Sequence, residues 1–200
     1  MSDGQPEPII RLFFGFDLPR EIGQRAAGLR TLVTDPKKVV RWIRSVNLHL
    51  TVRFLGPSPQ SMVPEIISGL GTRCADIGPI RLRIEKTGVF PQPARPRVLW
   101  LGVTGELPKL QRVEAEIHEA VQPLGYPREE REFVPHITLG RVRYVKKVTP
   151  DVTMYLGAQY EPVDCILKVL HLYASGVGEK GIFYTPLASF PLEISDQENS

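Results

Sequence analysis

Two of the four histidines stand in near-identical settings, each followed two residues later by a threonine. The first lies in the run His49-Leu50-Thr51-Val52, and the second lies 87 residues further along, in His136-Ile137-Thr138-Leu139. Side chains alternate between the two faces of a β-strand, so a strand would place each imidazole beside a hydroxyl and turn the apolar side chains away. The spacing therefore predicts two matching His–Thr pairs, each on one strand face.

These groups are suited to cleaving a phosphodiester. Imidazole titrates near pH 6.5, so a neutral histidine can take a proton from water while a protonated one gives a proton to the leaving oxygen. Threonine hydroxyls can hold the non-bridging oxygens for in-line displacement. If pseudo-symmetry relates the two motifs, they face each other across a cleft, with His49 and His136 as catalytic candidates and Thr51 and Thr138 as substrate-binding candidates.

Two other roles for the histidine pair are core packing and zinc binding. A zinc site needs a third or fourth ligand, and no Cys, Asp or Glu stands at motif spacing beside either histidine. The sequence therefore predicts no metal site. Of the other two histidines, His118 is expected at an exposed helix position and His171 in a packing role on a late strand.

Arginines close to each motif are candidates for binding the phosphate. Arg53 falls on the same face as His49 and Thr51 under strict alternation. The equivalent position in the second motif is Gly140, and Arg141 reaches the cleft only if a bulge at Gly140 changes the register. We therefore rank Arg53 above Arg141. Trp42 and Phe90 could stack on a nucleobase, but packing is the favoured role for both.

The elements that must position these residues occur in a repeated order. The first half predicts a strand over 9–16, a helix over 20–33 and a His-bearing strand over 48–55, and the second half predicts a strand over 97–103, a helix over 107–124 and a His-bearing strand over 133–141. Further helices are expected over 62–74 and 150–157, and strands over 80–85, 163–174 and 182–192. Pro186 and Pro191 place the last strand at an edge or bulge.

The repeated order indicates an internal duplication, with each copy forming one lobe. We expect an α+β fold that is bilobal, with two pseudo-symmetric antiparallel sheets, helices on the outer faces and a central cleft. The single domain would span 9–194 with one His-x-Thr motif in each lobe, between a flexible leader (1–8) and a flexible tail (195–200).

Composition excludes several classes of protein. With 200 residues and 42% hydrophobic side chains, the chain can bury a core and is not dominated by disorder. The net charge of +3 is too small to indicate a partner. Of the 25 basic residues, 17 are Arg, and this excess has two explanations, phosphate recognition and a bias in genome composition. Two isolated cysteines and a start without a signal peptide or membrane span predict a cytoplasmic protein that has no contact with the membrane.

The motif-bearing runs 49–56 and 133–141 resemble the paired signatures of the 2H phosphoesterase superfamily, and more narrowly the RNA 2′,3′-cyclic phosphodiesterases, also named 2′-5′ RNA ligases. The resemblance extends over residues 11–14, 88–91, 95–100 and 189–192. It implies a bilobal fold and hydrolysis of RNA 2′,3′-cyclic phosphate ends to 2′-phosphomonoesters, with neither metal nor cofactor. It also implies that His49 is the general acid, that His136 is the general base, and that Thr51 and Thr138 hold phosphate oxygens.

The expected partner is RNA with a 2′,3′-cyclic phosphate end, or a small cyclic nucleotide, and we expect a monomer. Two alternatives to hydrolysis stay open: a non-catalytic module that binds RNA ends, and ATP-independent 2′-5′ ligation by the reverse reaction. The intact histidine pair favours an enzyme over a binding module, and the high concentration of water favours hydrolysis over ligation.

Overall fold

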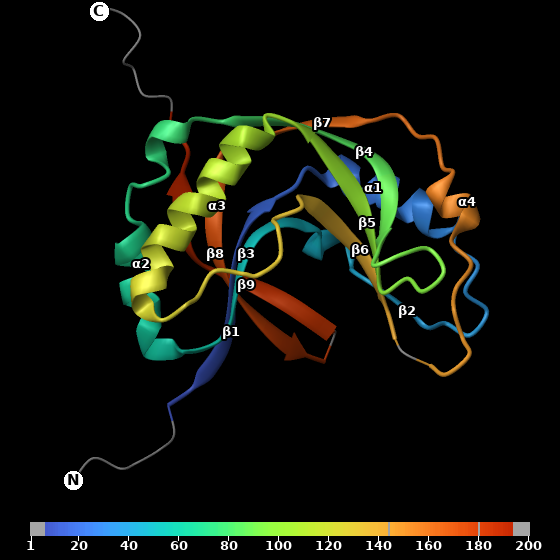
Figure 1. The fold of residues 1–200 in the computed structure, drawn as a ribbon, viewed down its shortest axis with the longest axis horizontal. Coiled ribbons are helices and arrows are strands. Elements are labelled where there is room, and N and C mark those ends of the chain that lie inside the picture. Colours follow the sequence, from blue (N-terminus) through green and yellow to red (C-terminus); the bar gives the residue numbers. More distant parts are fainter. Residues whose placement is uncertain (1–6, 144, 180, 194–200) are drawn as a thin grey trace, which may run out of the picture.

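The computed structural model describes residues 7–143, 145–179 and 181–193, which form two antiparallel sheets with helices around them (Figure 1). The four-stranded sheet has the order β3-β1-β8-β9, with β1 Ile9–Asp17, β3 His49–Pro59, β8 Val169–Gly178 and β9 Gly181–Pro191. The five-stranded sheet has the order β2-β6-β5-β4-β7, with β2 Val40–Trp42, β4 Ile80–Phe90, β5 Val98–Gly105, β6 His136–Val142 and β7 Val163–Leu167. The predicted α+β fold with two antiparallel sheets is confirmed.

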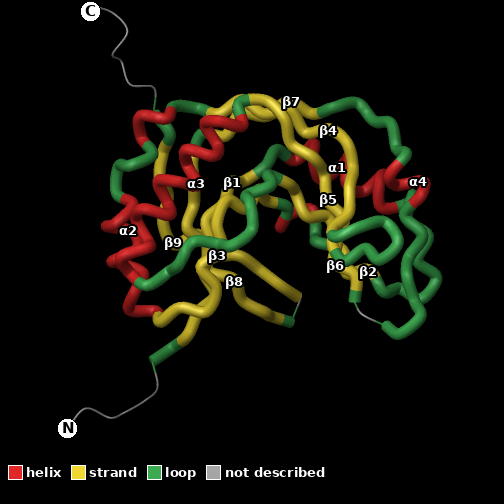
Figure 2. Tube along the Cα trace, viewed as in Figure 1, coloured by secondary structure: helices red, strands yellow, loops and turns green. Residues whose placement is uncertain are grey.

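Four α-helices of the described residues flank the sheets: α1 Arg20–Arg30, α2 Val63–Leu70, α3 Leu107–Val121 and α4 Thr153–Leu156. Figure 2 shows α2 and α3 together along one side of the molecule and α4 on the other. Alternation along β1 turns Leu12, Phe14 and Phe16 into the core, where they join one continuous cluster that also contains buried residues of the five-stranded sheet. The two sheets therefore share one hydrophobic core.

The segment 163–174, expected as one strand, is two strands that belong to different sheets. Residues of β7 pair with β4, whereas those of β8 pair with β1, and Lys168 alone separates the two strands. Apolar alternation continues through both strands, so the pattern gives no sign of the break. The last strand, β9, lies at a sheet edge, as its prolines predicted.

The expectation that each half of the chain forms its own lobe is wrong. Although β4 follows the first motif, it pairs with β5 in the five-stranded sheet, and β8 and β9 of the second half join the four-stranded sheet. Each sheet nevertheless holds one motif strand, paired with the strand that precedes it in the same half: β3 with β1, and β6 with β5. The duplication itself stays a prediction. The predicted tail (195–200) and residues 1–6 of the predicted leader lie outside the described residues.

Candidate active site

Both motif histidines are the first residues of their strands and make the same hydrogen bond. The Nδ1 atom of His49 lies 2.8 Å from the carbonyl oxygen of Asn47, and Nδ1 of His136 lies 2.7 Å from that of Val134. A carbonyl oxygen can only accept, so each Nδ1 carries the hydrogen and donates it. Each Nε2 is left as the nitrogen that can take up or release a proton at the site.

A β-bulge follows the threonine in each motif and lies at the same place in both. In the first sheet, Thr51 pairs with Gly15 and Arg53 pairs with the adjacent Phe14. In the second, Thr138 pairs with Trp100 and Gly140 pairs with the adjacent Leu99. The residue after each threonine, Val52 or Leu139, is therefore unpaired, and alternation reverses beyond it. The side chain five residues after each histidine, Phe54 or Arg141, consequently faces the cleft.

The same bulge removes Arg53 from the cleft, so the expected placement beside His49 and Thr51 is wrong. Arg53 is 2% exposed and forms an ion pair with Glu114 on α3, with 3.1 Å between Nη1 and Oε1. Its Nη2 donates to the carbonyl oxygen of Pro127. Strict alternation failed because an extra residue in the strand shifts the face. The predicted ranking of the two arginines as phosphate-binding candidates is therefore reversed, because Arg141 lines the cleft and Arg53 does not.

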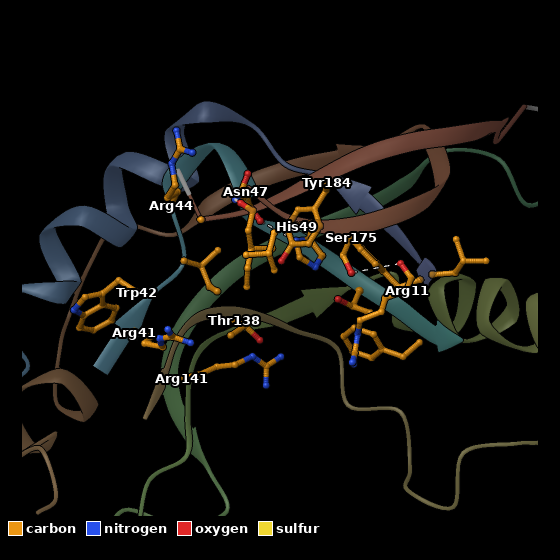
Figure 3. A pocket seen from close by; sticks show the side chains of 18 of the residues that line it. Arg11, Arg41, Trp42, Arg44, Asn47, His49, Thr138, Arg141, Ser175 and Tyr184 are labelled. Atoms are coloured by element: carbon orange, nitrogen blue, oxygen red, sulfur yellow. Dashed lines mark hydrogen bonds between the residues drawn. The ribbon is translucent and has the colours of Figure 1, made fainter. Parts of the chain in front are cut away.

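The cleft between the sheets has a volume of about 660 Å³ and brings together residues from both motifs (Figure 3). His49 and Thr51 come from β3, and Thr138 and Arg141 come from β6. Three further arginines line it, together with polar and aromatic side chains from the hairpin of β8 and β9 and from the approach to β3: Arg11, Arg41, Arg44, Asn47, Ser175 and Tyr184. The cleft is therefore cationic and can receive an anion.

The electrostatics of the site favour neutral imidazoles in the free protein. Burial lowers the pKa of His49 and of His136 below the ordinary 6.5, and the hydrogen bonds to the two carbonyls oppose this effect. The charge on Arg141 lowers both pKa values further. His136 also lowers the pKa of His49, which is expected of two imidazoles that lie near each other, although His136 itself is not among the residues that line the cleft.

One carboxylate distinguishes the surroundings of the two histidines. Asp17, at the end of β1, is paired with His49 in the sheet register and raises the pKa of that histidine. It accepts a hydrogen bond of 2.6 Å from the hydroxyl of Tyr173, and its Oδ2 lies 3.7 Å from Nε2 of His171. His171 thus belongs to a polar network beside His49 and also contacts Ser189, with 2.9 Å between Nδ1 and Oγ.

Aromatic rings pack against both motif histidines. Phe13 and Tyr184 each lie 4.8 Å from the ring of His49, between ring centres, and Phe90 lies 5.1 Å from that of His136. Phe90 also packs on Trp100 at 5.0 Å. These contacts, together with the two carbonyls, fix the orientation of the imidazoles.

Trp42 lies at the end of the cleft, where its ring covers Gly140. A Cβ atom on that glycine would come within 2.9 Å of the ring, so only glycine leaves room for it. The guanidinium carbon of Arg30 lies 5.5 Å from the ring centre. Trp42 and Phe90 thus both have the packing contacts that the favoured interpretation requires.

His118 is 7% exposed, so its predicted exposed position is wrong. The helix α3 packs against α2 as well as against strands, and its buried face is therefore wider than the single stripe read from the sequence: Leu110, Val113, Ile117, His118, Ala120 and Val121.

Sequence reasoning missed Arg41, Arg44, Asp17 and Tyr184 as residues of the site. A signal for the first two was present, because Arg41 and Arg44 stand just before the first motif. Asp17 and Tyr184 reach it only through strand pairing between distant segments. Within the part of the chain that the structure describes, no group of three or more His, Cys, Asp or Glu side chains is arranged to hold a metal ion. No helix of the described residues is long and apolar enough to cross a bilayer.

Known proteins match the chain in sequence. A family model of the 2′-5′ RNA ligase superfamily matches residues 18–179. An RNA 2′,3′-cyclic phosphodiesterase of Aquifex aeolicus is 29% identical over 185 residues, which cover 92% of this chain and 98% of that protein. A phosphodiesterase of the same name from Thermus thermophilus is 31% identical over 188 residues, which cover 92% of this chain and 90% of that one.

Solved structures match it in fold. The protein TT0787 of Thermus thermophilus superposes with a TM-score of 0.74 at 28% identity, covering 92% of this chain and 99% of that one. LigT of E. coli, complexed with 3′-AMP, superposes with a TM-score of 0.71 at 27% identity, with the same coverage.

Two sheets that each carry a His-x-Thr strand into one cleft are the architecture of a 2H phosphoesterase, and the sequence resemblance to that superfamily is confirmed. The chain belongs to the 2′-5′ RNA ligase superfamily.

Proposed function

We propose that this protein hydrolyses the 2′,3′-cyclic phosphate at the 3′ end of RNA, or of a small cyclic nucleotide, to a 2′-phosphomonoester. The observation that carries the proposal is the pair of histidines whose Nδ1 atoms are fixed by carbonyls, with His136 near enough to lower the pKa of His49 and with His49 lining a cationic cleft. Relatives named RNA 2′,3′-cyclic phosphodiesterase support it, as do LigT structures that hold 3′-AMP, ATP or phosphate.

In the proposed reaction, neutral His136 removes a proton from water through Nε2, and the water oxygen forms a bond to phosphorus. The bond between phosphorus and the 3′ oxygen breaks, and protonated His49 gives its Nε2 proton to that oxygen. The products are a 2′-phosphate and a free 3′ hydroxyl. The histidines then hold exchanged protonation states, which proton exchange with solvent restores.

Asp17 supports assigning the acid to His49. Its carboxylate raises the pKa of His49 and so favours the protonated ring, whereas no carboxylate among the described residues acts in this way on His136. Proton donation requires the protonated form, and proton removal requires the neutral form. This difference agrees with the roles that the family resemblance implies.

Threonines and an arginine complete the proposed site. Thr51 and Thr138 line the cleft from opposite sheets, where their hydroxyls can donate to the non-bridging oxygens. Arg141 supplies positive charge to the phosphate, a role that Arg53 cannot take because it is buried against α3. The two histidines perform both proton transfers, so we propose that neither a metal ion nor a cofactor takes part.

The same groups, acting with a 5′ hydroxyl in place of water, would join that hydroxyl to the phosphorus of a 2′,3′-cyclic phosphate end as the 3′ oxygen leaves, so ligation is the minor outcome of the same mechanism. A module that only binds RNA ends needs no pair of opposed titratable groups. Monomeric state and a cytoplasmic location remain predictions.

The proposal is tested by incubating cytidine 2′,3′-cyclic monophosphate with the protein in excess EDTA and identifying the product. We expect the 2′-phosphate, formed at an unchanged rate in EDTA. We also expect losses of about a hundredfold or more in His49→Ala and His136→Ala, since general acid and base catalysis each contribute about that much. Melting curves of both variants control for loss of fold. Full activity in either variant would rule out the acid–base pair, and loss of activity in EDTA would indicate a metal.

A substrate with sulfur at the bridging 3′ position separates the two roles. Sulfur is a good leaving group that needs no proton, so His49→Ala should recover most of its activity on this substrate while His136→Ala should not. Recovery by His136→Ala instead would reverse the assignment.

A further inference from the structure

Arg41 and Arg141 form a like-charged pair on adjacent strands. Arg41 on β2 stands directly opposite Arg141 on β6 in the sheet register, and both are exposed and line the cleft. Side chains directly opposite each other in antiparallel strands have Cβ atoms about 5 Å apart, and like charges there destabilise the sheet. The pairing therefore costs stability in the free protein, and an anion bound between the two guanidinium groups would remove the cost.

The charge of these arginines is not offset by a carboxylate of the described residues. None of those carboxylates lies within 4.0 Å of the guanidinium groups of Arg41, Arg44 or Arg141. Other exposed arginines do have acidic partners: Arg83 lies 3.4 Å from Asp164, and Arg112 lies 2.6 Å from Asp76. The positive charge at this end of the cleft is thus available to an external anion.

Three of the four arginines that line the cleft lie on the same side of His49. Figure 3 shows Arg141, Arg41 and Arg44 on one side of His49, and Arg11 on the other. Three guanidinium groups thus lie on one side of His49 and one on the other, so the first side carries more positive charge. The cleft consequently has one strongly cationic exit.

An RNA whose 3′ end is a cyclic phosphate continues only in the 5′ direction. Once that end lies between the histidines, the preceding phosphates must leave the cleft through a single exit. Guanidinium groups bind phosphates by charge and by paired hydrogen bonds. The segment 41–44 offers two of them beyond the reacting centre.

We propose that Arg41 and Arg44 bind the phosphodiester backbone of the nucleotides that precede the cyclic end, so that the site favours polynucleotide ends over free cyclic mononucleotides. This inference rests on the proposed function. It adds that the substrate is a polynucleotide and that the part of the polynucleotide preceding the cyclic end leaves the cleft past β2.

The test compares kcat/KM for cytidine 2′,3′-cyclic monophosphate with kcat/KM for a pentanucleotide ending in the same cyclic cytidine. The wild-type protein should prefer the pentanucleotide. A hydrogen bond to a charged group is worth about tenfold, so Arg41→Gln and Arg44→Gln should each lower that preference by about tenfold. The matched control is Arg20→Gln, because Arg20 is exposed on α1 and does not line the cleft. It should keep the wild-type preference.

Salt dependence gives a second readout that needs no turnover. Binding of the 2′-phosphorylated pentanucleotide weakens with salt, and each phosphate contact contributes about 0.7 to the slope of log K against log salt for a single strand. Each of Arg41→Gln and Arg44→Gln should reduce the slope by about that amount. Failure of the proposed function would appear as no turnover of either substrate, and this binding measurement would still test the strand path.

Two results would overturn the inference. One is an unchanged preference and an unchanged salt slope in the double variant Arg41→Gln/Arg44→Gln. The other is a loss of preference in Arg11→Gln and not in the double variant, because the strand would then leave by the opposite exit.

Discussion

Both imidazoles titrate at a lower pH than a histidine in water, because burial lowers the pKa of each by disfavouring the charged ring. The mechanism needs one protonated and one neutral ring, so the free protein holds the productive pair of states mainly on the acid side of pH 6.5, the ordinary pKa of the side chain. A bound phosphate anion stabilises imidazolium. The bell-shaped profile of kcat should therefore lie at higher pH than that of kcat/KM.

The substitution Asp17→Asn should lower the pKa of His49 in the free protein, because it removes the carboxylate that raises this pKa. The pKa of His136 should stay close to its wild-type value. The measurement is an NMR titration of the imidazole resonances in both proteins. Asparagine still accepts the hydrogen bond from Tyr173, so the packing around residue 17 is retained. A rise in the pKa of His49, or no change, would contradict the electrostatic account of the site.

The paired bulges are the feature of the strands that decides which side chains enter the cleft. Each follows a His-x-Thr motif and sends the next alternate residue, Arg53 or Gly140, to the core side. Arg53 then reaches Glu114 of α3 and the carbonyl of Pro127, in the segment that leads from α3 to β6. A residue of the first motif strand thereby anchors the segment that precedes the second motif.

Breaking this buried ion pair should destabilise the protein markedly. Removing one partner of a buried pair costs about 3–5 kcal/mol, and we expect about 3 kcal/mol for Arg53→Met, because Glu114 is 15% exposed and regains some water. The free energy of unfolding is measured in urea. The control is Arg112→Gln, also an ion-pair partner at α3, whose pair with Asp76 is exposed and should be worth about 0–1 kcal/mol. Equal losses in the two variants would show that Arg53 is not an anchor.

The types and order of most elements followed from the sequence, since periodic apolar residues mark β1, α1, β3, β5, α3 and β6. The His–Thr pairs followed as well, because both lie before the bulge, where alternation holds. That Arg141 and not Arg53 lines the cleft could not be predicted, because nothing in the first motif distinguishes a bulged strand from a regular one. The three-residue strand β2 was also missed, as it is too short to show a period.

At the scale of the whole molecule, the two sheets are built from exchanged strands. The five-stranded sheet takes β2 and β4 from the first half of the chain, and the four-stranded sheet takes β8 and β9 from the second. Neither half can complete its own sheet, and one core cluster spans both. The cleft between the sheets is thus held by a single folding unit.

Unfolding in urea should therefore be a single transition. Both tryptophans, Trp42 and Trp100, lie in the five-stranded sheet, so their fluorescence reports on that sheet, whereas far-UV circular dichroism reports on both. We expect the two curves to coincide. A fluorescence change completed while much of the dichroism signal remains would indicate that the four-stranded sheet unfolds separately.

The hydrogen bonds from the two histidines to the carbonyls of Asn47 and Val134 limit which mutations can alter the tautomers of the imidazoles. An orienting carboxylate belongs to a side chain, and one altered codon deletes it. The oxygens at positions 47 and 134 belong to the main chain, and every amino acid supplies the same atom. The tautomer of each imidazole is thus encoded in the path of the chain, so drift at these two positions leaves it intact, and only an insertion or deletion that moves the peptide would remove it.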